Sequence, residues 1–235
     1  MRLRTVLRGA VTTLGVGVVI VLALVVILTA LRTELPRSPG VMSDALGPDP
    51  GEPVAAYLQR AADSLATDTP AATGPRWALV TTERPWTAAE AAEATAGLPR
   101  VSTLYAQTPE PGVAMPVLTQ TLAEPAAGEA GRAPVLARAL DRIARAAAGT
   151  QDTGRAAQAH ALTATRVRAG APAVIALIVR ADTATLRDVA DEPGVRSVDA
   201  LPPDAVWGRF AVRPLLPQQR DAADPLPDGA PVPEA

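Results

Sequence analysis

The longest apolar run of the chain lies near its N-terminus. Residues 11–31 carry no charge and consist of Thr, Gly and apolar side chains. This length suits a helix that crosses a hydrocarbon core, which needs about 20 residues. The preceding segment 1–10 holds three arginines and no acidic residue, and short basic flanks of this kind stay in the cytoplasm. The pattern predicts a single-pass transmembrane helix at 11–31, a cytoplasmic segment at 1–10 and an extracytoplasmic remainder.

A cleaved signal peptide is the alternative interpretation of the same run. The apolar region of a signal peptide is usually about 7 to 15 residues long and ends at a small-x-small cleavage site. In this chain Leu28 and Ala30 stand where that pair is needed, and Arg32 follows. The length of the run and the unsuitable Leu28 favour an uncleaved anchor.

Two further segments are rich in proline. Residues 32–75 begin with four prolines before residue 53, and apolar side chains then recur at helical spacing at Val54, Tyr57, Leu58, Ala61 and Leu65. We interpret 32–75 as a Pro-rich stalk that contains this one amphipathic helix. Residues 217–235 contain Pro, Asp and Ala without an apolar period, and we expect them to form a disordered tail.

The part between stalk and tail, residues 76–216, contains two strand–helix–strand patterns. In the first, strands are expected at 77–82 and 101–106, and Thr87 and Glu90 have the spacing of a capping box that begins a helix. We expect this helix to end at Gly97, a residue suited to a left-handed cap.

The second pattern has a continuous apolar strand at 173–179, a helix capped by Asp182, and a strand at 195–201. Two such units can interleave into one antiparallel sheet with both helices on a single face. The chain is therefore predicted to be an α+β protein with a ferredoxin-like extracytoplasmic domain. An amphipathic pattern at 134–148, followed by a polar segment at 155–168 that holds Leu162 and Val167, indicates a helical hairpin inserted at about 133–168.

The segment Ala173 to Leu201, which reads AVIALIVRADTATLRDVADEPGVRSVDAL, resembles the strand–helix–strand of subtilisin propeptides and related proteinase inhibitors. It covers about 30 of the 235 residues. With the following residues 202–206 it also resembles the end of the extracytoplasmic domain of bacterial division proteins of the DivIB type. In those proteins the domain directly follows the membrane helix, whereas here about 140 residues intervene. Neither resemblance carries a functional residue to this chain.

Composition excludes several kinds of chemistry. The chain has no Cys and one His, which excludes disulfides, thiolate nucleophiles, Cys-ligated metals and any site that needs two imidazoles. His160 has no ligand partner at helical spacing, and no serine lies in a hydrolase motif. The absence of Lys and Asn beside abundant Ala, Arg, Pro and Gly is typical of GC-rich coding sequences, so this composition indicates genome bias and not function. We expect a protein of the bacterial cell membrane. We predict no catalytic residue, cofactor or metal.

The charge balance and the aromatic residues point to a protein partner. From Arg32 onward there are 19 basic and 24 acidic residues, which disfavours binding to nucleic acid or anionic headgroups. An edge strand is expected at 205–212. Trp and Arg are common in binding hot spots. The candidate partner surface consists of Trp207, Arg209, Phe210 and Arg213, with core packing as the alternative and favoured role of Trp207 and Phe210.

Two functions follow as hypotheses. The first is a non-enzymatic interaction or scaffolding module of the cell envelope that binds another envelope or membrane protein. The second, implied by the propeptide resemblance, is a regulator or inhibitor of an extracytoplasmic peptidase. In that case residues 215–218 would have to enter the enzyme's cleft.

Overall fold

The structure is a computed structural model, and it describes residues 44–66, 74–124 and 131–235. The expected transmembrane segment 11–31 lies outside these residues. Within the described ranges, no helix is long and apolar enough to cross a membrane. The described residues belong to one unit that begins at Ser43.

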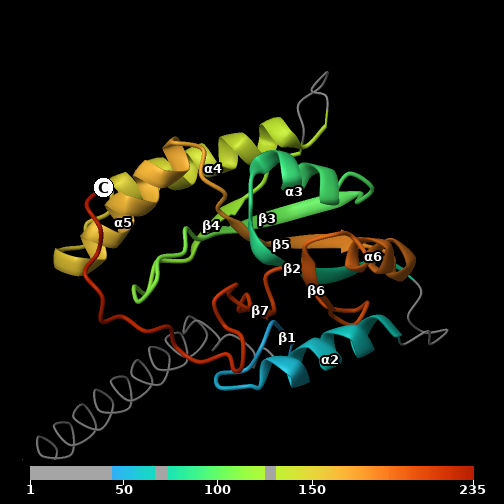
Figure 1. Cartoon of the computed structure of the whole chain (residues 1–235). Coiled ribbons are helices and arrows are strands. Elements are labelled where there is room, and N and C mark those ends of the chain that lie inside the picture. The colour runs from blue at the N-terminus through green and yellow to red at the C-terminus, as the bar shows by residue number, and fades with distance from the viewer. Residues whose placement is uncertain (1–43, 67–73, 125–130) are drawn as a thin grey trace, which may run out of the picture. The chain divides into compact units, whose positions relative to one another are not determined.

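Five strands form one antiparallel sheet in the order β4–β3–β5–β2–β6 (Figure 1). They are β2 (Arg76–Trp86), β3 (Arg100–Ala106), β4 (Leu118–Thr121), β5 (Val174–Ala181) and β6 (Val195–Ala200). β5 pairs with a strand on each side, and both of its faces are buried, which explains its continuous apolar sequence. The prediction of an α+β fold with an antiparallel sheet is confirmed.

The two strand–helix–strand units interleave within this sheet. The first unit consists of β2, α3 (Ala88–Ala94) and β3, and β5 lies between its two strands. The second consists of β5, α6 (Thr183–Ala190) and β6, and β2 lies between its two strands. Each unit thus supplies one of the two central strands, so neither unit can complete the sheet without the other.

Helices cover one face of the sheet. Besides α3 and α6, this layer contains α4 (Ala133–Ala148) and α5 (Gly154–Arg168), which pack side by side as the expected hairpin (Figure 1). Leu136 and Ile143 of α4 and Leu186 of α6 are buried in one apolar cluster with Leu104 and Leu177 of the sheet. This cluster is the main core of the unit.

The opposite face, where it is formed by β2 and β5, is covered by short segments that are distant in sequence. β1 (Ala45–Leu46) and β7 (Ala211–Val212) pair as parallel strands, and Leu46 and Phe210 pack on Leu79 and Ile178 of the sheet. The prediction of a strand at 205–212 holds for Ala211 and Val212 alone. Residues 202–210 form turns instead, because Pro202 and Pro203 lack amide donors and Gly208 takes a left-handed conformation (φ 77°).

The segment that contains α2 (Val54–Ala66) packs on the domain, although we assigned it to the stalk. Its apolar face includes Tyr57 and Ala61, which are buried against Leu215 and Ala223. The amphipathic spacing predicted the helix and its buried face, but the spacing does not say which surface the face meets. That surface is provided by residues from the C-terminal part of the chain.

Residues 217–235 lie along the domain, in contrast to the expected disordered tail. Val54 N–H donates to Asp221 O at 2.8 Å, and Ala223 N–H donates to Glu52 O at 2.9 Å. Further on, Asp228 accepts two hydrogen bonds from Arg155 at 2.6 and 2.8 Å. We call residues 217–230 the strap. It is held by backbone and side-chain hydrogen bonds, one ion pair and the buried side chain of Ala223. Contacts of these kinds require no apolar period in the sequence.

The strap predicts resistance to proteolysis. Because the chain has no Lys, trypsin cleaves it after Arg residues alone. We expect cleavage after Arg220 to be much slower in the folded full-length protein than in urea, since the adjacent Asp221 carbonyl is hydrogen-bonded to Val54. Mass spectrometry of a digestion time course measures this rate. Equal rates in the folded and unfolded protein would contradict the placement of the strap.

The predicted capping box of α3 is present. Glu90 N–H donates to Thr87 Oγ1 at 3.2 Å, and Thr87 N–H donates to Glu90 Oε2 at 2.7 Å. The helix ends at Ala94, before the expected Gly97, which has no positive φ. Thr95 Oγ1 donates to Ala91 O at 2.6 Å in the last turn, so a side chain replaces the expected glycine cap.

Replacement of Thr87 by Ala should lower the free energy of unfolding by about 1 kcal/mol, because the cap hydroxyl is lost. Urea denaturation of the purified full-length protein in detergent measures this change. Thr87→Ser retains the hydroxyl and should keep most of the stability. An equal loss in the two variants would show that the methyl group of Thr87, and not the cap, provides the stabilisation.

Candidate functional site

Three side chains lie in a row across one end of the sheet. Arg180 of β5 pairs directly with Trp77 of β2 on one side and with Arg100 of β3 on the other. Directly paired residues of antiparallel strands project from the same face. The guanidinium carbons of Arg100 and Arg180 each lie 5.5 Å from the centre of the Trp77 ring, within cation–π distance.

A tight turn places a second tryptophan over this row. Arg209 N–H donates to Val206 O at 3.0 Å, and Gly208, the third residue of the turn, has the positive φ that a type II turn requires there. Trp207 occupies the second position. Its ring centre lies 4.5 Å from that of Trp77 and 5.8 Å from that of Phe210. The three aromatic rings therefore form one cluster.

The outer side of this cluster is exposed. Trp207 is 43% exposed and its neighbour Val206 is 54% exposed. Val117, which precedes β4, is the remaining large apolar side chain that is exposed in the described part of the chain. An exposed tryptophan held in a fixed position by other aromatic rings is typical of a binding hot spot.

The structure brings together some of the four residues predicted for the partner surface. Trp207 and Phe210 are in contact, with Phe210 buried in the core beneath the cluster. Arg209 is exposed beside Trp207 in the same turn. Arg213 has a structural role instead, since its Nη2 donates to Ala223 O at 3.3 Å and its backbone N–H donates to Leu46 O at 2.9 Å.

Sequence reasoning missed Arg100, Arg180 and the role of Trp77. These residues come from three strands, so no local motif contains them. The interleaved strand order could have identified the two arginines. It places the start of β3 opposite the end of β5, and arginines occupy both positions.

A buried carboxylate holds the strand that pairs with the segment after the turn. Asp199 of β6 is 4% exposed and accepts a hydrogen bond from Gly47 N–H at 2.8 Å. Gly47 has a φ of 98°, and an added Cβ would lie 1.7 Å from Arg213 O. No other residue fits at this position. Asp199 thus holds the end of β1, which pairs with β7 directly after the aromatic cluster.

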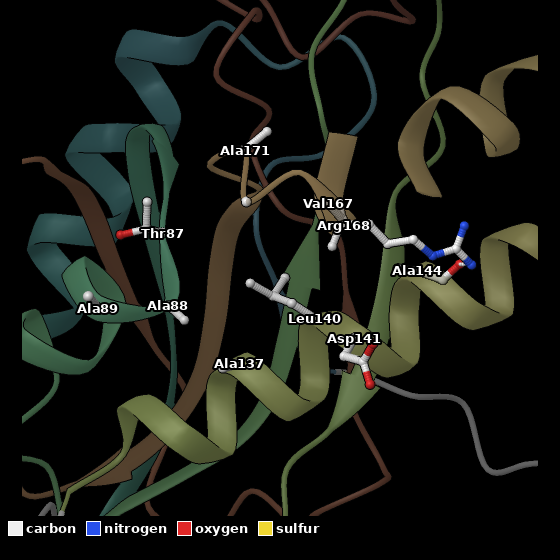
Figure 2. A pocket seen from close by; sticks show the side chains of 11 residues that line it. Thr87, Ala88, Ala89, Ala137, Leu140, Asp141, Ala144, Val167, Arg168 and Ala171 are labelled. Atoms are coloured by element: carbon white, nitrogen blue, oxygen red, sulfur yellow. Dashed lines mark hydrogen bonds between the residues drawn. The ribbon is translucent and has the colours of Figure 1, made fainter. Parts of the chain in front are cut away.

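A pocket of about 410 Å³ lies among the helices on the other side of the sheet (Figure 2). Leu140, Ala144 and Val167 contribute apolar lining. Its polar groups already have structural partners: Arg145 donates to Asp141 at 2.5 Å, and the Thr87 hydroxyl caps α3. The pocket could hold an apolar side chain, but the groups that face it do not form an acid–base or nucleophilic set.

The residues considered for chemistry also have structural contacts. His160 Nδ1 lies 3.0 Å from Ala156 O and 3.2 Å from an Asp152 oxygen. Ser64 Oγ donates to Ala61 O and accepts from Ala200 N–H, which joins α2 to β6. In the part of the chain that the structure describes, no three metal-ligating side chains come together.

No protein-family model, curated protein or solved structure matches this chain.

Burial raises the pKa of Asp199 above its ordinary value of 3.8. The unfolded chain therefore loses this proton at a lower pH than the folded chain, and the contribution of Asp199 to stability falls as the pH rises above about 4. We expect the free energy of unfolding of the wild-type protein, minus that of Asp199→Asn, to be larger at pH 4 than at pH 7. Urea denaturation of both proteins over this range measures the difference, and a constant value would contradict the inferred pKa.

Proposed function

We propose that this chain is a single-pass, membrane-anchored protein of the bacterial cell envelope whose extracytoplasmic domain binds another envelope or membrane protein without catalysing a reaction. The proposal rests on the exposure of Trp207. This side chain is 43% exposed, although its ring centre lies 4.5 Å from that of the buried Trp77. The binding surface consists of Val206, Trp207 and Arg209, supported from behind by Trp77 and Phe210.

The remaining parts of the proposal rest on the sequence and on the strand order. The uncharged run 11–31 and the basic segment 1–10 support an anchor with a cytoplasmic N-terminus. The order β3–β5–β2–β6 of the two interleaved units supports a ferredoxin-like domain, extended by β4 and by the hairpin of α4 and α5. Folds of this kind host many functions, so the proposed binding function rests on the exposed surface around Trp207 and not on the fold.

The contacts of residues 215–218 favour this function over the regulation of a peptidase. Leu215 is fully buried, and Gln218 Nε2 donates to Gln107 Oε1 at 3.0 Å. A segment that enters an enzyme's cleft needs a free extended backbone. This one would first have to leave its core contacts, whereas Trp207 is accessible as it stands.

Affinity purification from solubilised native membranes tests the proposed surface. We expect the tagged full-length protein to recover a partner. The Trp207→Ala variant should recover at least about 30-fold less of this partner, because hot-spot tryptophans contribute about 2 kcal/mol or more to binding. Quantitative mass spectrometry measures the recovery.

Val117→Ala is the matched control, since it also removes an exposed apolar side chain but lies on another part of the domain. It should recover the partner as the wild-type protein does. Circular dichroism must show that both variants are folded. Equal recovery with Trp207→Ala and the wild-type protein would refute the proposed surface.

A further inference from the structure

We propose that Arg100 and Arg180 bind a carboxylate of an acidic segment in the partner protein, beside the apolar contact made by Trp207. This inference rests on the proposed function and specifies the chemistry of the partner. It assigns a ligand to two arginines that the fold places together and that have no counter-charge among the described residues.

The pairing of the two arginines is unfavourable in the isolated domain. Like charges that lie directly opposite on neighbouring strands destabilise a sheet. Arg100 and Arg180 are such a pair, and in the described residues neither of them forms an ion pair with a carboxylate. A bound anion would neutralise this repulsion, so the pair favours an anionic ligand.

The hydrogen-bonding capacity of the pair is largely unused. Arg180 Nε is buried without a hydrogen-bond partner, and Arg100 Nε donates to Ser102 Oγ at 3.0 Å. Neither side chain donates another hydrogen bond within the described ranges. Other buried or half-buried arginines of the domain have partners; Arg76, for example, donates to three backbone carbonyls. The half-buried Arg180 differs from them, and Arg100 is exposed, so both have donors available for a ligand.

The aromatic rings hold these donors in place. Each guanidinium lies 5.5 Å from the centre of the Trp77 ring, a contact that restricts the side chain while it stays charged. A planar guanidinium binds carboxylates through parallel hydrogen bonds. Trp207 and Val206 lie on the same cluster and offer an apolar contact next to the charge. The expected ligand is therefore a Glu or Asp side chain adjacent to an aliphatic or aromatic one.

The overall charge favours a protein partner over a membrane or nucleic acid. From Arg32 onward the chain has 19 basic and 24 acidic residues. This excess of acid repels extended polyanions, for which binding depends on many simultaneous phosphate contacts. A single carboxylate in a partner needs only the local pair of arginines.

Peptide binding tests the inference directly. The probe is the fluorescein-labelled peptide Gly-Ser-Glu-Leu-Glu-Trp-Ser-Gly, and its counterpart has Gln in place of both Glu residues. Fluorescence anisotropy with the full-length protein in neutral detergent should show binding of the acidic peptide at least tenfold tighter than that of the Gln peptide. Arg100→Gln and Arg180→Gln should each weaken binding of the acidic peptide at least fivefold.

Arg142→Gln is the matched control, because Arg142 is exposed on α4, on the helix-covered side of the sheet. It should bind the acidic peptide as the wild-type protein does. Phosphatidylglycerol added to the same detergent micelles should not displace the peptide. Equal affinity for the two peptides, no binding of either, or displacement by this lipid would overturn the inference. Arg100→Gln changes an exposed residue, so it provides a folded variant if Arg180→Gln is unstable.

The same variants separate this inference from the proposed function. In the affinity purification, loss of the partner with Trp207→Ala and with Arg100→Gln supports both proposals. Loss with Trp207→Ala but full recovery with Arg100→Gln and Arg180→Gln would leave the interaction surface in place and refute the carboxylate ligand.

Discussion

The burial of β5 on both faces is the constraint on which the rest of the domain depends. A strand of this kind must lie inside a sheet, with a paired strand at each edge and a covering layer on each face. β2 and β3 provide the edges, and α3, α4 and α6 provide one layer. The second layer comes from α2 and from short segments around β1 and β7, which have few apolar residues and depend on hydrogen bonds for their position.

This unequal covering explains where the candidate site lies. On the helix side, apolar side chains fill the space over the sheet. On the other side, the cover near the ends of β3 and β5 consists of one turn, so Trp77 is shielded by Trp207 and not by a helix. The turn must both close the core and face the solvent. An aromatic residue satisfies both demands, because one side of its ring packs on Trp77 while the other stays accessible.

Sequence patterns predicted the elements well where local chemistry decides them. The caps at Thr87 and Asp182 and the amphipathic faces of α2 and α4 are all present. The patterns failed where distant contacts decide. Residues 217–235 have no periodicity, yet partners from 51–54 and Arg155 hold them. The stretch 205–212 has strand-like composition, but a turn with Gly208 replaces most of the strand.

The candidate site shows the same division. Trp207 and Phe210 could be selected as a potential hot spot because these two aromatic residues lie close together in a chain with few of them. Arg100 and Arg180 lie 80 positions apart and become neighbours through the sheet register. The sequence alone could not show that Arg213 and Arg209 have different roles. Only the hydrogen bond to Ala223 O shows that the Arg213 side chain has a structural partner.

The parallel pairing of β1 with β7 has a mechanical consequence. The turn that carries Trp207 leads directly into β7, and β7 is joined to β1, the first described strand of the chain. A force applied at Trp207 would therefore reach the N-terminal end of the unit through a short path of two paired residues. The five-stranded sheet lies beside this path and not along it. Tension between the turn and the N-terminal segment would load the β1–β7 pair before it loads the core.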